Sequence, residues 1–120
     1  MNDVAGLLIA AGFDGVERVD DMVYARGDGP SAPEFMVTQA GRQTRLVIRY
    51  PVRASAAQMQ AWMGTNPQGR LTIRDGETEL SLSLPLDDLA GSLTLWRKLM
   101  SAASRAAVQW RRDLRGVEGM

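Results

Sequence analysis

The chain has 120 residues, of which 45% are hydrophobic and 23% charged, and its 14 Lys and Arg residues balance its 14 Asp and Glu residues. These values predict one globular domain over residues 1–120 and exclude an overall charge that would attract nucleic acid or an anionic membrane. The chain has no Cys and no His. Disulfides, thiol nucleophiles, thiolate or imidazole metal ligands and the commonest acid–base catalyst are therefore excluded.

Taken in chain order, the N-terminal segment shows no targeting or membrane signal. Its apolar run Leu7–Ala11 is too short for a membrane span or a signal-peptide core, and no basic residue precedes Arg18. Asp3 is placed to N-cap a short helix that ends near Ala11, with Gly12 as its stop. We therefore expect a cytoplasmic protein without a membrane partner.

Strands are predicted next. The segment Val16–Arg26 reads as a strand that breaks or turns near Asp20–Asp21, and a loop follows at Gly27–Pro33. The spacing of Gly27, Gly29 and Ala32 within this loop superficially matches a dinucleotide fingerprint. That fingerprint needs a helix after it, whereas a strand follows here, so no cofactor is expected.

Two further strands are predicted at Phe35–Thr38 and Thr44–Val52, joined by a turn at Ala40–Gly41. The second alternates, with Leu46, Ile48, Tyr50 and Val52 on one face and Arg45, Val47, Arg49 and Arg53 on the other. With Arg74 on a possible neighbouring strand, Arg45 and Arg49 could form a basic strip on an open sheet face. Glu77 and Glu79 are available as cross-strand partners. An ion-paired, solvated face is favoured, and a site for an acidic peptide is the alternative.

The second half predicts a helix, a hairpin and a long helix. Ser55 and Gln58 match a capping box that opens a helix ending at Gly64 and carrying Met59, Trp62 and Met63. A turn at Asn66–Gly69 leads to strands at Arg70–Arg74 and Glu79–Leu86, joined by the hairpin dipeptide Asp75-Gly76. Asp87 is predicted to cap the closing helix.

The closing helix is expected from about Asp88 to Arg115, because an apolar stripe runs from Leu89 to Leu114 at spacings of four and three. Such a helix is roughly 42 Å long at 1.5 Å per residue, longer than the roughly 35 Å diameter of a compact domain of this size. Its second half needs a covering surface. Two covers are open: a second copy, contacted by Ala103, Ala107, Trp110 and Leu114, or the chain's own first helix.

The resulting fold class is α+β, with an antiparallel sheet of about five strands, helices on one face, the order α-β-β-β-α-β-β-α and a long C-terminal helix. This layout, with Trp62, Asn66 and the Asp75-Gly76 hairpin between Trp62 and Leu84, resembles the fold of type III secretion chaperones and of the YbjN-like family. The resemblance implies a small, dimeric, non-enzymatic protein that holds an extended segment of a client.

Three functions follow as hypotheses. The first is a non-enzymatic, chaperone-like protein-binding homodimer, with Trp62, Met63, Arg45, Arg49 and Arg74 as partner contacts and no catalytic, cofactor or metal residues. The second is an enzyme or small-ligand binder with a pocket between sheet and long helix, using Tyr24, Tyr50 or a carboxylate. The third is a structural subunit of a larger assembly. A nucleic-acid partner is not expected, because the arginine-bearing face lacks stacking aromatics.

Overall fold

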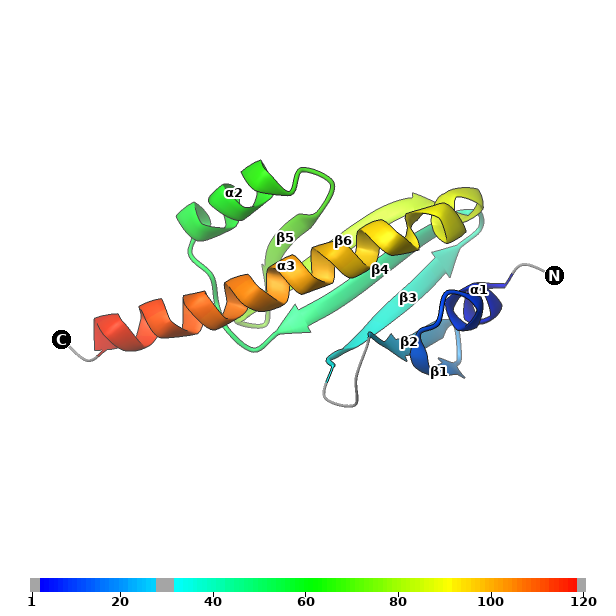
Figure 1. Ribbon diagram of the computed structural model, residues 1–120, viewed down its shortest axis with the longest axis horizontal. Helices are drawn as coiled ribbons and strands as arrows, with labels where there is room; N and C mark the ends of the chain where they lie inside the picture. Colours follow the sequence, from blue (N-terminus) through cyan, green and yellow to red (C-terminus); the bar gives the residue numbers. More distant parts are fainter. Residues whose placement is uncertain (1–2, 28–31, 119–120) are drawn as a thin grey trace.

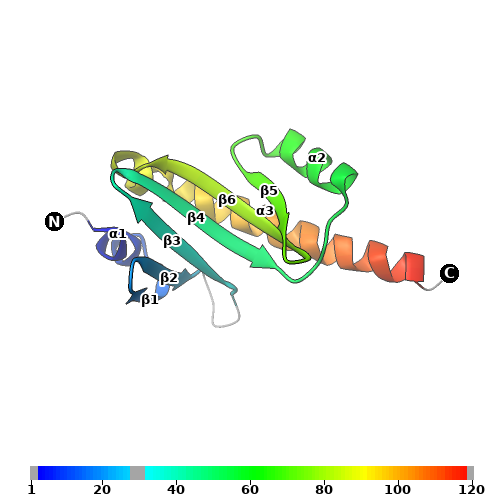
Figure 2. The same ribbon diagram turned by 180° about the vertical axis from the view of Figure 1, so that it is seen from behind.

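An antiparallel sheet with helices over one face forms the framework of the protein (Figures 1 and 2). The computed structural model describes residues 3–27 and 32–118, so most of the loop predicted at Gly27–Pro33 lies outside the described residues. In the described ranges the helices are α1 (Val4–Ala10), α2 (Ala56–Thr65) and α3 (Leu86–Glu118). The strands are β1 (Asp14–Val19), β2 (Met22–Arg26), β3 (Glu34–Ala40), β4 (Gln43–Tyr50), β5 (Arg70–Arg74) and β6 (Glu77–Pro85).

The strand order is β1-β2-β3-β4-β6-β5, and every neighbouring pair is antiparallel. The α+β class is confirmed, with one strand more than the five or so predicted. The additional strand arises because Val16–Arg26 does turn at Asp20–Asp21, with Val19 opposite Met22 and Asp20 at a φ of 55°. Asp tolerates this left-handed conformation better than most residues.

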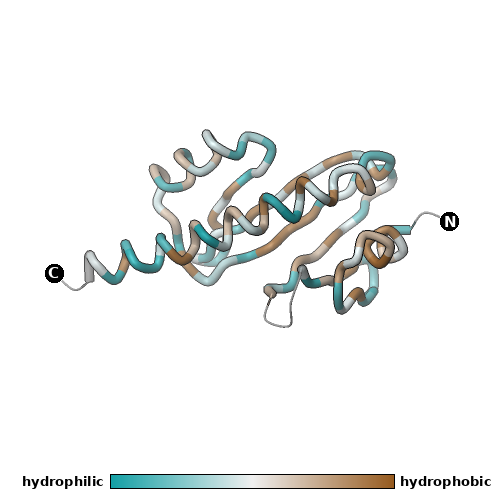
Figure 3. Tube along the Cα trace, in the orientation of Figure 1, coloured by the Kyte–Doolittle hydropathy of each residue, from teal (hydrophilic) through white to brown (hydrophobic). Residues whose placement is uncertain are grey.

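The two faces of the sheet differ as the alternation predicts. Leu46, Ile48 and Tyr50 of β4 face the helices and are buried, together with their β6 partners Leu80 and Thr78. Trp96 of α3 is completely buried over this face, in edge-to-face contact with Phe35 at 5.8 Å between ring centres. The core therefore lies between sheet and helices, and the other face is open. Figure 3 shows hydrophobic residues along the central strands and hydrophilic ones along the end of α3.

The predicted N-caps of α1 and α2 are present, whereas the predicted cap of α3 is not. The Asp3 carboxylate accepts the Gly6 N–H at 2.6 Å, and the capping box of Ser55 and Gln58 is complete at the start of α2. The prediction that Asp87 caps α3 is wrong, because α3 begins at Leu86. Asp87 instead lies in the first turn, where it favours the helix dipole and pairs with Arg42.

The protein is elongated, with extents of 56 × 28 × 23 Å. α3 has 33 residues, roughly 50 Å at 1.5 Å per residue, and it runs beyond the sheet so that the two ends of the chain lie at opposite ends of the molecule (Figure 1). Near its first half, the Arg97 guanidinium stacks 3.9 Å from the centre of the Phe13 ring and donates to the Ala11 carbonyl at 2.7 Å. These contacts hold α1 and the start of β1 against α3.

Candidate functional site

Three arginines on the open face surround one buried carboxylate. The register places Glu79 of β6 between Arg49 of β4 and Thr72 of β5, with Arg45 and Arg74 close by. Nη2 of Arg45 lies 3.1 Å from Oε1 of Glu79, while Nε of Arg49 and Nε of Arg74 lie 3.3 and 3.4 Å from Oε2. The structure therefore brings the three predicted arginines together, with Glu79 as the shared counter-charge.

The arginine cluster, meaning Arg45, Arg49 and Arg74, borders a shallow hollow of about 370 Å³ that is also lined by Met36 and Val47. The Glu79 side chain is 3% exposed, whereas the three arginine side chains remain 40–57% exposed. A guanidinium has five N–H donors, and one carboxylate cannot occupy them all. The cluster can therefore hold the open face together and still present donors to solvent, although Asp75 and Glu77 also pair with Arg49.

A second hollow, of about 590 Å³, lies at the outer edge of the sheet. It is lined by Met63 of α2, the turn Pro67–Gly69, the start of β5 and Ser81–Ser83 of β6. Met63 is half-buried, and its sulfur accepts the Leu71 N–H at 3.4 Å. Trp62 is 8% exposed and packs so closely on Gly69 that an added Cβ there would lie 2.9 Å from its ring. Trp62 therefore supports the hollow from the core, and only Met63 lines it.

This second hollow adjoins a free strand edge. β5 pairs with β6 only from Glu77 to Ser81, whereas β6 continues to Pro85. The Leu86 N–H donates to the Arg42 carbonyl at 2.7 Å, so by the alternation of antiparallel pairing the even-numbered residues of β6 direct their backbone groups at β4. The N–H and C=O of Ser83 then point outward, past the end of β5. The sequence contains one indication of this edge, because the predicted strand Arg70–Arg74 is shorter than its predicted partner Glu79–Leu86.

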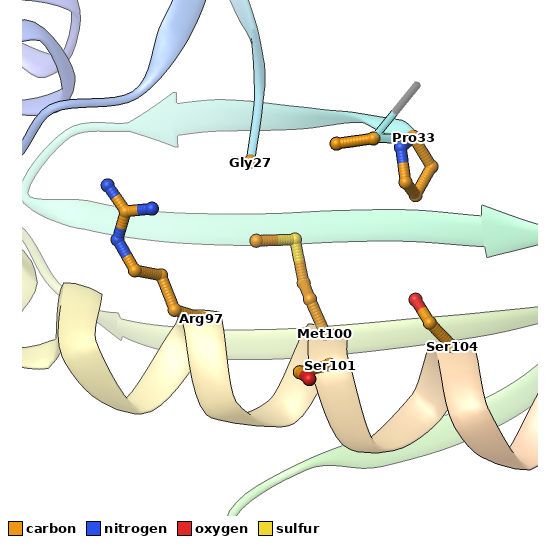
Figure 4. A pocket seen from close by; sticks show the side chains of 7 residues that line it. Gly27, Pro33, Arg97, Met100, Ser101 and Ser104 are labelled. Carbon is orange, nitrogen blue, oxygen red and sulfur yellow. The ribbon is translucent and has the colours of Figure 1, made fainter. Parts of the chain in front are cut away.

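The predicted partner contacts thus divide between two places. Met63 lies beside the outer edge on the helix side, while the arginine cluster lies on the open face. A third hollow, of about 310 Å³, lies between α3 and the ends of β2 and β3, where Arg97, Met100, Ser101 and Ser104 face Gly27 and Pro33 (Figure 4). Arg97, its charged member, is already engaged with Phe13 and Ala11.

The two tyrosines of the ligand-pocket hypothesis do not converge. Tyr24 lies on the open face opposite Met36, whereas Tyr50 lies under α3. The Tyr50 hydroxyl donates to the Met100 carbonyl at 3.0 Å and accepts from the Ser104 hydroxyl at 3.2 Å. Burial raises the pKa of Tyr50 to about 12, and the Ser104 hydrogen bond opposes part of that rise. Both hydroxyl contacts are internal to the protein.

Most of the predicted dimer contact is buried within the single chain. Ala103, Ala107 and Trp110 are 0, 1 and 6% exposed, and only Leu114, at 49%, lies on the surface. The cover of Trp110 is neither of the two expected surfaces. It is the connection from β4 to α2, whose Ala54 and Ser55 border Trp110. A second copy cannot reach the three buried residues in this conformation.

Side-chain hydrogen bonds hold the connection from β4 to α2 in place. The Thr78 hydroxyl of β6 donates to the Val52 carbonyl at 2.7 Å and accepts the Ala54 N–H at 2.9 Å. Farther along, the Gln58 amide donates to Asp113 at 3.0 Å and ties the start of α2 to the end of α3. These long-range contacts carry the connection across the apolar stripe of α3.

The overall arrangement matches a solved structure. YbjN from E. coli, described as a proposed transcription regulator, superposes with a TM-score of 0.60 at 13% sequence identity, covering 91% of this chain and 89% of that one. This chain has the YbjN fold. At that identity the likeness extends to the fold alone. No protein-family model matches the sequence, and no curated protein matches it.

Residues 3–27 and 32–118 contain neither a membrane-spanning helix nor a cluster of metal-ligating side chains. No helix there is long and apolar enough to cross a membrane, and no group of three or more acidic side chains is placed to hold a metal ion.

Proposed function

We propose that this protein is a non-enzymatic binding module that holds an extended segment of a partner protein and acts as a homodimer. The observation that carries the proposal is the outer edge of β6, where Ser83 directs unpaired backbone groups beside the hollow lined by Met63. An extended peptide can add to such an edge through main-chain hydrogen bonds, while a neighbouring hollow accepts its side chains. The proposed segment lies antiparallel or parallel to β6 beyond the end of β5.

The alternative of a ligand pocket between sheet and α3 has less support. Trp96, Phe35 and Leu80 fill that layer at 0–1% exposure. Tyr24 and Tyr50 lie on opposite faces of the sheet, so they do not form one site. The edge site needs no catalytic group, because strand addition requires only backbone donors and acceptors and an adaptable apolar side chain such as Met63.

The test is selection of peptides from a displayed random library on the purified protein, followed by binding to two variants. Ser83→Pro removes the outward N–H and blocks pairing, yet Pro is tolerated where a strand N–H faces solvent. Ser83→Val keeps the N–H and is the matched control. We expect selected peptides to bind wild type and Ser83→Val alike, and to lose about tenfold or more in affinity on Ser83→Pro, equivalent to about 1.4 kcal/mol.

Slowed hydrogen exchange of the Ser83 amide on peptide binding is the second expected readout. Failure to select any peptide, or equal binding to both variants, would refute the edge site. Circular dichroism and urea denaturation of Ser83→Pro establish that the variant is folded when binding is measured.

A further inference from the structure

Unbalanced positive charge gathers on one side of the projecting part of α3. Val108, Arg111, Arg112 and Arg115, here called the α3 flank, lie at spacings of three, four and seven residues and so share one face of the helix. Val108 is 43% exposed, and Arg112 and Arg115 are exposed. The same face, continued toward the start of α3, carries Ser101 and Ser104, and the Ser104 side chain points toward Pro33, next to the start of β3 (Figure 4).

Unbalanced negative charge gathers at the other end of the molecule. Asp14, Glu17, Asp20 and Asp21, here called the acidic corner, lie on β1 and on its turn into β2, and all four are exposed. Arg18 lies among them, and Arg26 of β2 lies opposite Asp14 in the register. Val19, next to the turn, is 40% exposed. β1 is also an edge strand of the sheet, so no strand in the described part of the chain pairs with its outer side.

In the described part of the chain, most arginines of the sheet and its turns, unlike those of the α3 flank, are paired with carboxylates. Arg42, Arg45, Arg49 and Arg74 all have carboxylate partners within 4 Å. Among the side chains that the structure describes, neither the α3 flank nor the acidic corner has an ion-pair partner. The flank carries three positive charges, and the corner carries four negative charges against Arg18 and the neighbouring Arg26. The chain is neutral overall, but its two ends therefore carry charges of opposite sign.

We propose that the α3 flank binds the acidic corner of a second copy of this chain. The projecting end of α3 and the N-terminal end lie at opposite ends of the molecule (Figure 1). A second copy laid alongside the first in the opposite direction would therefore bring each projecting helix to the N-terminal end of the other. Such a pair has twofold symmetry, so the contact between the α3 flank and the acidic corner forms twice, once from each copy. Val108 and Val19 add apolar surface to the charge complementarity. A nucleic acid would complement the flank but would be repelled by the corner.

This inference rests on the homodimer of the proposed function and adds the surface through which it forms. The α3 variant is Arg112→Glu with Arg115→Glu, and the corner variant is Glu17→Lys with Asp21→Lys. Each makes both ends of the molecule alike in sign, so each is expected to weaken self-association by about tenfold or more. An equimolar mixture of the two variants is expected to regain wild-type affinity, because unlike ends meet again.

Sedimentation velocity at about 0.05 M and about 0.5 M NaCl measures the association, which should weaken at the higher salt concentration. The control is Arg70→Glu with Arg53→Glu, which changes net charge as the α3 variant does but lies on β5 and on the connection from β4 to α2, which borders Trp110 on the opposite face of α3. It should associate like wild type. Urea denaturation of each variant separates weak association from loss of folding.

Each other outcome counts against the interface in a different way. A wild-type dimer that neither variant weakens overturns this interface and leaves the proposed homodimer intact. A monomer under all conditions overturns both, while the peptide-holding edge is judged by its own selection experiment. Loss of binding to a labelled DNA duplex in the α3 variant, with unchanged self-association, identifies a polyanion as the occupant and overturns the proposal.

Discussion

Replacing Glu79 with Gln is expected to destabilise the protein by about 2 kcal/mol. The carboxylate is almost fully buried and lies within 3.1–3.4 Å of three guanidinium groups. Gln preserves its shape and removes the negative charge they share. A hydrogen bond to a charged group contributes about 1.5–3 kcal/mol, whereas an exposed ion pair contributes about 0–1 kcal/mol. Because the acid is buried, the first range applies, and because the arginines are half-exposed, the expected loss lies in its lower part.

Urea denaturation measures this loss through the fluorescence of Trp62, Trp96 and Trp110, all of which are buried. Glu77→Gln is the matched control on the same strand and face. Its single contact, with Arg49, is 3.9 Å long and both side chains are 38–40% exposed, so a loss of less than about 0.5 kcal/mol is expected. Equal effects of the two substitutions, or a Glu79→Gln protein as stable as wild type, would refute the role given to the buried carboxylate.

Three further predictions concern the core. In a Tyr24→Phe protein, where Tyr50 is the one tyrosine left, ultraviolet titration should show no tyrosine ionisation until the pH nears 12. The pKa of Tyr50 rises from 10.0 to about 12 on folding, so its burial as a neutral hydroxyl stabilises the protein fully below pH 10, and this stabilisation is lost as the pH rises toward 12. Urea denaturation at increasing pH would measure that loss. Gly69→Ala should cost about 1–3 kcal/mol by crowding Trp62 and Leu80, whereas Gly64→Ala, with open space around it, should be neutral or stabilising in urea denaturation. Trp110→Ala should cost about 3–5 kcal/mol in the monomer; unchanged stability with loss of self-association would contradict its burial.

Local signals predicted most of the elements because each acts within a few residues. The Asp3 and Ser55 caps, the alternation of β4 and the turn at Asp75-Gly76 all appear as expected. The arginine cluster was also within reach of sequence reasoning, because side chains of one sign on alternate residues of neighbouring strands must meet on one face. Asp87 was misplaced by two positions, because α3 begins at Leu86. Its ion pair with Arg42 could not be read from the sequence, because the two residues are 45 apart in the chain.

By itself the sequence determined that this chain is an α+β domain with one covered and one open sheet face and a helix longer than the sheet. Only the tertiary structure decided what covers the second half of that helix. Periodicity shows that Ala103, Ala107 and Trp110 need a cover, but it cannot show which one, because the segment that borders Trp110 is the connection after β4, far away in the chain. That connection is held there by Thr78, which lies 26 residues along the chain from Val52. The free edge of β6 and the opposite charges at the two ends likewise depend on contacts between residues far apart in the chain.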